Sequence, residues 1–145
     1  MNFSVDTLFY GLEFRKLMER ELQPVCISSD LQKIDLMILY YLSKSGEHDT
    51  SSDMMDLKMF TRGHISQALT RLENHGYIDM KTDSKDHRCT HNSITNKGNQ
   101  LVKEIEKHYK NIHNIIFKDI SSEEKKVLMK VANKINENID KAINI

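Results

Sequence analysis

Proline occurs once in this chain, at Pro24, and glycine occurs five times among 145 residues. Proline interrupts a helix because it lacks a backbone N–H donor, and all-β folds need many turns that contain glycine or proline. The scarcity of both residues therefore favours long helices and argues against a β-sandwich or a disordered linker protein. A hydrophobic fraction of 39% and a charged fraction of 29% are typical of a single globular domain with a modest core.

The charged side chains balance over the whole chain but are unevenly placed along it. Lysine and arginine together number 21, as do aspartate and glutamate, so the formal net charge is zero. Residues 1–57 have five basic and ten acidic side chains, whereas residues 58–98 have seven basic and four acidic ones. A neutral total argues against a histone-like polycation. The basic central segment is compatible with nucleic-acid binding, because the position of the charge decides such binding.

The sequence predicts neither a membrane span nor a secretory signal. It has no run of about eighteen apolar residues, and its N-terminal stretch lacks a basic flank followed by a long apolar core. Cys26 and Cys89 form no CxxC pair and no disulfide framework. We therefore expect a cytoplasmic protein with reduced thiols and no membrane partner.

The first part of the chain has the apolar spacing of two helices. Leucine and methionine recur at helical intervals over residues 6–23, which predicts a helix that ends near Pro24. Ser29-Asp-Leu-Gln32 has the form of a capping box, with a side-chain acceptor and a glutamine three residues on. It predicts a second, strongly apolar helix over residues 31–43.

The middle of the chain predicts two short helices joined by a tight connection. Thr50-Ser-Ser-Asp53 is another capping box and precedes the short helical segment DMMDLKMF. Thr61 fits an N-cap position, and the helix that follows it ends at Gly76. Two capped helices in this arrangement are typical of a helix-turn-helix.

The hydrophobic period changes from helical to alternating after Gly76. The segment YIDMKTD places Ile78 and Met80 on one face, SKDHR forms a polar tip, and CTHNSIT has a β-like composition. This pattern predicts a two-stranded hairpin, or wing. The expected fold class is therefore mainly α with a small β-hairpin wing (α+β), a winged helix-turn-helix.

Two long helices are predicted at the C-terminal end. Thr95-Asn-Lys-Gly98 starts the first, and the capping box Ser121-Ser-Glu-Glu124 starts the second. Their apolar residues form narrow stripes, such as Leu128, Val131 and Ile135 in the last helix. A chain this small offers such helices little core, so we expect them to bury their stripes against a second copy of the chain.

The helix that follows Thr61 has an apolar and a polar face. Its buried side is predicted to hold Ile65, Ala68, Leu69 and Leu72. Glutamine pairs with adenine in the major groove, and serine, threonine and asparagine suit phosphates or base edges. The candidate DNA-binding residues of this helix and its start are Thr61, Arg62, Gly63, Ser66, Gln67, Thr70, Arg71 and Asn74. The alternative is an ordinary solvated face, but the capped helix before it and the basic wing after it favour DNA.

The predicted wing tip, Lys85-Asp86-His87-Arg88, adds three candidate DNA-binding residues. An arginine at a hairpin tip fits the narrow, negative minor groove, and Lys85 adds positive charge beside it. Asp86 stands two residues before Arg88 and is placed to orient it through a charge-assisted hydrogen bond. The alternative is a polar turn with a surface ion pair of little energetic consequence.

The wing sequence resembles the signature of MarR-family transcriptional regulators. Asp83-Ser-Lys-Asp86-His-Arg88 followed by Ile94-Thr95-Asn-Lys-Gly98 is similar to that family's D-x-x-D-x-R and L-T-x-x-G motifs. The specific match covers about residues 52–98. The resemblance implies a winged-helix homodimer with intertwined first and last helices that binds a palindromic DNA operator. It also implies that Arg88 reaches the minor groove and that Asp86 positions it.

Two departures from the family pattern bear on the wing. Asn92 stands where the family usually has an apolar strand residue, which predicts a loosely packed hairpin. Ser84 stands where proline is common, which leaves the conformation of the tip less preset.

We therefore predict three parts: an N-terminal dimerisation helix (1–30), a winged helix-turn-helix DNA-binding core (31–98) and C-terminal dimerisation helices (99–145). The predicted function is sequence-specific regulation of transcription by a homodimeric repressor, which a small-molecule or other effector releases from a double-stranded operator. The alternative of a winged-helix protein-interaction module is weaker, because a partner-binding helix exposes aromatic or leucine side chains. No nucleophile elbow, phosphate-binding glycine loop or metal-ligand motif is present, so neither an enzyme nor a cofactor is expected.

The mode of effector sensing stays open at the sequence level. A small-molecule pocket has five candidate lining residues, Phe9, Leu12, Cys26, Met37 and Tyr40, although any core uses such side chains. Redox sensing is an alternative, because the Arg88 cation next to Cys89 is expected to lower the pKa of that thiol. Cys26 is flanked by Val25 and Ile27 and is more typical of a partly buried small hydrophobe.

Metal sensing is the third alternative. Glu104 and His108 are four residues apart on one predicted helix face, and Cys26 is placed to join them from another helix. The chain lacks the H-x3-H and C-x2-C spacings of recognisable metal sites. Scattered surface histidines are therefore the favoured interpretation, and no metal ligand is assigned.

Overall fold

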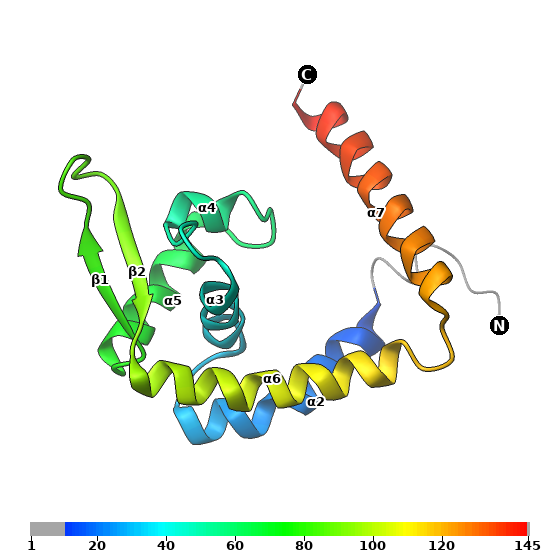
Figure 1. The fold of residues 1–145 in the computed structure, drawn as a ribbon, viewed down its shortest axis with the longest axis horizontal. Helices are drawn as coiled ribbons and strands as arrows, with labels where there is room; N and C mark the ends of the chain where they lie inside the picture. The colour runs from blue at the N-terminus through cyan, green and yellow to red at the C-terminus, as the bar shows by residue number, and fades with distance from the viewer. Residues whose placement is uncertain (1–10, 145) are drawn as a thin grey trace. The chain divides into compact units, whose positions relative to one another are not determined.

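The computed structural model describes residues 11–144, which divide into one compact unit up to Ile112 and a second from His113 onwards. The described elements are six helices and two strands (Figure 1). In chain order they are α2 (Leu12–Ser29), α3 (Lys33–Lys44), α4 (Ser51–Met55), α5 (Arg62–Asn74), β1 (Ile78–Thr82), β2 (Thr90–Ile94), α6 (Asn96–Ile116) and α7 (Ser122–Ile143). The predicted class, mainly α with a β-hairpin, is confirmed.

The first described helix runs further than its sequence predicted. Pro24 is an exposed residue inside α2, and the helix continues for five residues beyond it, to Ser29. The helix ends instead at Ser29, because the C-cap residue Asp30 has a left-handed φ of 56°, and Leu31 N–H donates to Cys26 O. The left-handed residue reverses the chain, which proline in a helix interior does not do by itself.

The predicted capping box at Ser29 is wrong. Ser29 is the last residue of α2, and its hydroxyl donates to the carbonyl of Val25 at 2.6 Å. Gln32 takes the N-cap position of α3, and its backbone N–H donates to the Asp35 carboxylate at 2.9 Å. The helix therefore begins at Lys33 rather than Leu31.

The helix-turn-helix is built by local capping, as the sequence predicted. Thr50 Oγ1 accepts from Asp53 N–H at 3.2 Å, and the Asp53 carboxylate accepts from Thr50 N–H at 3.0 Å. Thr61 Oγ1 accepts from His64 N–H at 3.2 Å and starts α5. Gly76, with a φ of 80°, follows the end of α5, because a left-handed residue there is least strained as glycine.

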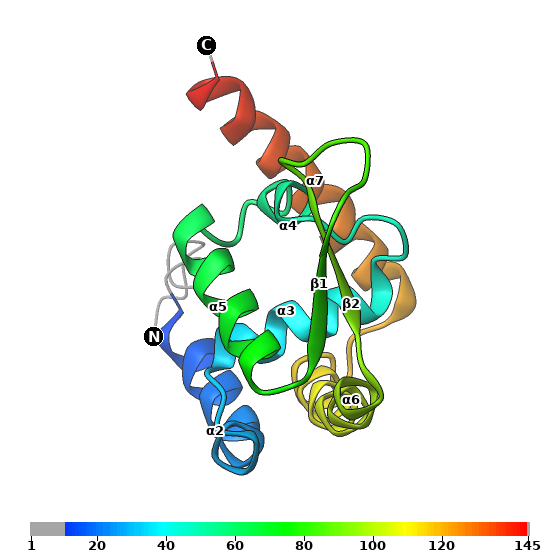
Figure 2. The ribbon, with the colours of Figure 1, turned by 90° about the vertical axis from the view of Figure 1, so that its left-hand side faces the viewer.

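The wing is a two-stranded antiparallel sheet in which Ile78 pairs with Ile94 and Thr82 pairs with Thr90. Its base is fixed to α6 by Thr95, whose Oγ1 accepts from Gly98 N–H and donates to Gly76 O. Figure 2 shows the hairpin with α4 and α5, the elements that form the candidate site.

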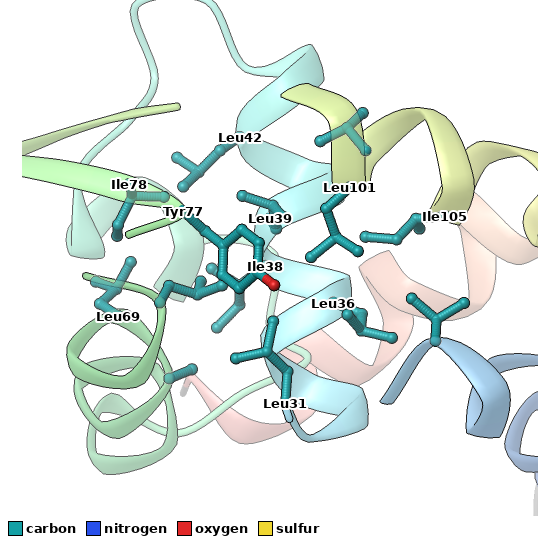
Figure 3. Packing of buried hydrophobic residues seen from close by; sticks show 14 of the residues in the cluster. Leu31, Leu36, Ile38, Leu39, Leu42, Leu69, Tyr77, Ile78, Leu101 and Ile105 are labelled. Carbon is teal, nitrogen blue, oxygen red and sulfur yellow. The ribbon is translucent and has the colours of Figure 1, made fainter. Parts of the chain in front are cut away.

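The core of the first unit is centred on α3. Leu36, Ile38 and Leu39 are fully buried there. Figure 3 shows these residues along α3, with Leu69 of α5 and Ile78 of β1 on one side of the helix and Leu101 and Ile105 of α6 on the other. Because α3 contacts both α5 and the second strand, this core sets the position of α5 relative to the wing.

The second unit contains the last residues of α6 and the whole of α7. The predicted capping box at its start is confirmed, since Ser121 Oγ accepts from Glu124 N–H and Glu124 Oε1 accepts from Ser121 N–H. No residue of α7 is buried in the described chain. Its exposed large apolar residues are Val127, Leu128, Met129, Val131, Ile139 and Ile143.

Over the described residues, no helix combines the length and the apolar character needed to cross a membrane.

Candidate nucleic-acid interface

Helix α5 buries one face and exposes the other. Ile65, Ala68, Leu69 and Leu72 pack into the core. The candidate residues Thr61, Arg62, Gly63, Ser66, Gln67, Thr70 and Asn74 are all exposed. This face therefore offers hydroxyl and amide groups, together with one arginine, at full access to a ligand.

Arg71 differs from the other candidates because its guanidinium points to the core. Its Nε and Nη2 atoms donate to the carboxylate of Asp35 at 2.9 and 2.8 Å, and Asp35 is fully buried. This contact raises the pKa of Arg71 further above its ordinary value. The structure thus gives Arg71 a partner within the protein that a helical wheel does not show.

A cleft of about 690 Å³ lies where α4, α5 and the wing tip meet. The sequence-predicted residues Arg62, Ser66, Asp86 and Arg88 line it together. Thr50, Ser51, Ser52, Met55, Cys89 and Thr90 also line it and were not predicted. Thr50 alone caps α4, so the two serines that follow it are not needed for the cap. Their hydroxyl groups were the sequence signal that could have added them to the candidate site.

The wing tip is ordered by two aspartates in succession. Asp83 Oδ1 accepts from the backbone N–H groups of Lys85 and Asp86 at 2.7 and 3.0 Å. Asp86 Oδ1 accepts from Arg88 N–H at 3.1 Å and from Arg88 Nε at 3.4 Å. The Arg88 side chain is 94% exposed. Asp83 therefore presets the turn without a proline at Ser84, and Arg88 extends from it into open space.

The base of the tip is tied to the loop before α4 through His91. Its Nδ1 lies 2.6 Å from Asp49 Oδ1 and its Nε2 lies 2.8 Å from Asp83 Oδ2. These two carboxylates raise the pKa of His91, and Asp49 contributes most. The hydrogen bond from His91, with those from the Asp86 and Lys85 backbone, lowers the pKa of Asp83 to about 2.

Asn92 does not loosen the hairpin, contrary to the sequence-based expectation. It is 3% exposed, and its Nδ2 donates to the backbone carbonyl of Asp49 at 2.8 Å. The amide at this position replaces apolar packing with a polar contact to the same loop that His91 holds. The amide nitrogen of Asn92 therefore anchors the hairpin, whereas its Oδ1 atom is buried without a hydrogen-bond partner among the described residues.

The cysteines do not have the properties of an activated thiol. Burial, followed by the charges of Asp83 and Asp86, raises the pKa of Cys89, so the expected lowering by Arg88 is wrong. Burial, followed by Asp35, also raises the pKa of Cys26. A thiol with a raised pKa is a poor nucleophile at neutral pH, and neither site favours redox sensing.

The candidate effector pocket is not assembled as predicted. Phe9 lies outside the described residues. Cys26 lines a cavity of about 400 Å³ with Leu22, Leu31 and neighbouring polar residues, but Leu12, Met37 and Tyr40 do not line it. Leu12 is 57% exposed, and Tyr40 packs on Tyr109 of α6 with ring centroids 4.6 Å apart.

The three side chains considered for a metal do not form a metal site. Across residues 11–144, no three His, Cys, Asp or Glu side chains are grouped as metal ligands would be. His108 instead faces Glu21 of α2, with 3.7 Å between Nδ1 and Oε2.

Comparison with known proteins defines the class of this fold. Residues 31–98 match the family described as the winged helix DNA-binding domain. No curated protein sequence matches the chain.

Solved structures then give the particular family whose fold the whole chain shares. A Listeria monocytogenes protein described as a MarR-family transcriptional regulator, complexed with a 26mer DNA, has a TM-score of 0.80 at 20% identity, over 98% of this chain and 92% of that one. The S. aureus MepR–DNA complex has a TM-score of 0.77 at 20% identity, over 94% of this chain and 99% of that one. A MarR-family regulator from Silicibacter pomeroyi has a TM-score of 0.74 at 18% identity, over 93% of this chain and 87% of that one. The resemblance to MarR-family regulators that the wing sequence indicated is confirmed in the fold.

Proposed function

We propose that this chain is a MarR-type, sequence-specific DNA-binding regulator that acts as a homodimer. The observation that carries the proposal is the cleft between α5 and the wing. Arg62 and Ser66 of α5 line the same cleft as the exposed Arg88 of the wing tip. A helix face of amides and hydroxyls beside a hairpin arginine matches the needs of the major and minor grooves, respectively.

The distribution of charge supports DNA as the ligand. Residues 58–98, which include α5 and the wing, carry seven basic against four acidic side chains. An excess this small gives one subunit few phosphate contacts, so useful affinity needs two subunits together. The solved structures with the same fold include two that are DNA complexes.

In the proposed dimer, residues 31–98 bind DNA, and residues 1–30 and 99–145 make the dimer contacts. The apolar residues exposed along α7 are suited to this role. Two α5 helices then enter successive major grooves about 34 Å apart, and the wings grip the flanking minor grooves. The half-sites of such an operator form a palindrome, because a two-fold symmetric protein reads two-fold symmetric DNA.

The proposed regulator is a repressor that acts in the cytoplasm by binding, not by catalysis. An effector that binds one dimer conformation better than another changes the spacing of the two α5 helices and releases the operator. The cavity of about 400 Å³ beside Cys26, at the α2–α3 connection and outside the cleft proposed for DNA, has room for a small molecule and is the proposed effector site.

Selection of DNA from a random-sequence pool by the purified protein tests this function. We expect an enriched palindromic sequence, bound more tightly than unselected DNA. Gln67→Ala relaxes the preference at one position of each half-site, because it removes a bidentate donor and acceptor. Lys107→Ala on α6, an exposed position away from the cleft, is the control; once sedimentation shows that this variant is still a dimer, it keeps the preference. Enrichment of no sequence contradicts the proposal, and a protein partner captured in its place indicates an interaction module.

A further inference from the structure

The imidazole of His91 joins two segments that are far apart in the sequence. Asp49 belongs to the loop between α3 and α4, and Asp83 stands at the end of β1, where the wing tip begins. The same Asp83 carboxylate, through its other oxygen, accepts the two backbone N–H groups that shape the tip. One chain of contacts therefore runs from the helix-turn-helix through His91 and Asp83 to the turn that carries Arg88.

We propose that His91 is a positioning residue for DNA binding, which in its protonated form holds the wing tip, and with it Arg88, in register with the recognition helix. This inference rests on the proposed function, since the purpose of the register is to let Arg88 and α5 contact one duplex.

The hydrogen bonds themselves require the protonated ring. A carboxylate accepts hydrogen bonds and donates none, and neutral imidazole has only one N–H. Contacts of 2.6 and 2.8 Å to two carboxylates therefore need both ring nitrogens to carry a proton. When the ring loses one proton, one carboxylate faces a nitrogen lone pair and that contact is lost.

The surroundings of His91 contain further charges, but none replaces these contacts. Lys81 is its partner across the hairpin and is exposed. Cys89 lies two residues before it, just outside β2, and its thiol has a raised pKa. In the first turn of α4, Asp53 Oδ1 lies 3.5 Å from His48 Nδ1, and the Asp53 carboxylate accepts from Thr50 Oγ1. Asn92 adds an uncharged tie from the next residue to Asp49 O, so the hairpin stays attached when the ring is neutral.

The direction of the pH effect follows from the two groups. Asp83, with its pKa at about 2, is ionised throughout the range in which DNA binding is measured. His91 has a raised pKa, so the contact is fully present below the ordinary histidine value of about 6.5 and is lost as the pH rises through the pKa of the folded protein. DNA affinity is expected to fall in that same window.

The test uses full-length protein and a fluorescent duplex obtained by the selection experiment. His64 of α5 and His87 of the wing tip are further imidazoles near the candidate site, so both are first replaced in a His64→Gln/His87→Gln background. In this background, we expect the DNA affinity to fall roughly tenfold as His91 deprotonates. A roughly tenfold change in affinity corresponds to the loss of about one charge-assisted hydrogen bond. Adding His91→Gln should hold affinity near the weaker value at every pH. An unchanged pH profile after this substitution overturns the inference, as does a background that shows no pH dependence.

Two further measurements keep the outcome decisive. Asp49→Asn leaves the imidazole in place and should shift the NMR titration of His91 and the midpoint of the binding profile together to lower pH. Independent midpoints overturn the inference. Without DNA, the Arg88 amide resonance should titrate with the His91 midpoint. If no duplex is selected but this coupling is seen, the proposed function fails while the wing contact stands; if the coupling is absent, the positioning role fails.

Discussion

Arg71 of α5 makes a two-pronged ion pair with the fully buried carboxylate of Asp35 in α3, with N–O distances of 2.9 and 2.8 Å. The pair joins the recognition helix to the centre of the core. It also shares Asp35 with the start of α3, where Gln32 N–H donates to the same carboxylate. The buried carboxylate of Asp35 thus fixes both the beginning of α3 and the position of α5.

Arg71→Ala is expected to destabilise the protein by about 3 kcal/mol, because it leaves a buried carboxylate without its cation. Arg62→Ala, on the same helix but exposed, should change the free energy of unfolding by less than about 0.5 kcal/mol. Urea unfolding of both variants measures the difference. Equal losses would show that the Asp35–Arg71 pair contributes nothing particular to stability.

Glycine at position 98 is required by close packing, whereas glycine at 63 is not. A Cβ on Gly98 would collide with the Tyr77 carbonyl and lie 2.6 Å from Ile94 Cγ2, but a Cβ on Gly63 meets nothing within 4 Å. Gly98→Ala should therefore cost about 1–3 kcal/mol. Gly63→Ala should leave stability unchanged or raise it by up to about 1 kcal/mol, yet weaken DNA binding if the backbone there approaches a phosphate. Thermal unfolding and DNA titration of both variants separate the two effects.

The raised pKa values of both thiols predict that DNA binding is insensitive to mild oxidation. Peroxide at a concentration that oxidises activated thiols should leave Cys89 reduced by mass spectrometry and leave the DNA affinity unchanged. Selective oxidation of Cys89 with release of DNA, abolished by Cys89→Ser, would restore the redox-sensor interpretation.

The exposed stripe of α7 is expected to support the dimer. Val131→Glu places a charge in this stripe and should shift the protein toward monomer and weaken DNA binding with it. Asn133→Glu adds the same charge on the other side of the helix and serves as the control. Sedimentation at several protein concentrations distinguishes the two, and an intact dimer in the Val131 variant would contradict this role for α7.

Local signals made much of the fold predictable. The Thr50–Asp53 and Ser121–Glu124 boxes were recognisable because a cap and its partner lie three residues apart. The same pattern failed at Ser29, where the hydroxyl bonds back to Val25 and the helix continues past Pro24. A capping pattern is informative only where the helix before it has already ended.

The parts of the site that were missed depend on distant residues. The partner of Arg71 is 36 positions away, and His91 bonds to a residue 42 positions away. The acids that raise the pKa of Cys89 include Asp49, from the loop before α4, and Asp53 of α4, both outside the wing. A helical wheel or a neighbouring arginine therefore suggested the wrong environment for these side chains, whereas the polar face of α5 needed only local periodicity.

We propose that the exposed arginine of the wing and the polar face of α5 bind one DNA duplex. The salt dependence of binding to the selected duplex, measured for wild type, Arg88→Ala and the charge-matched control Lys107→Ala, tests this proposal. We predict that Arg88→Ala weakens binding and lowers the salt slope by about 1 per subunit, because one cation no longer displaces counterions from the DNA, and that the control matches wild type. An Arg88→Ala protein that binds with wild-type affinity and slope would contradict the account.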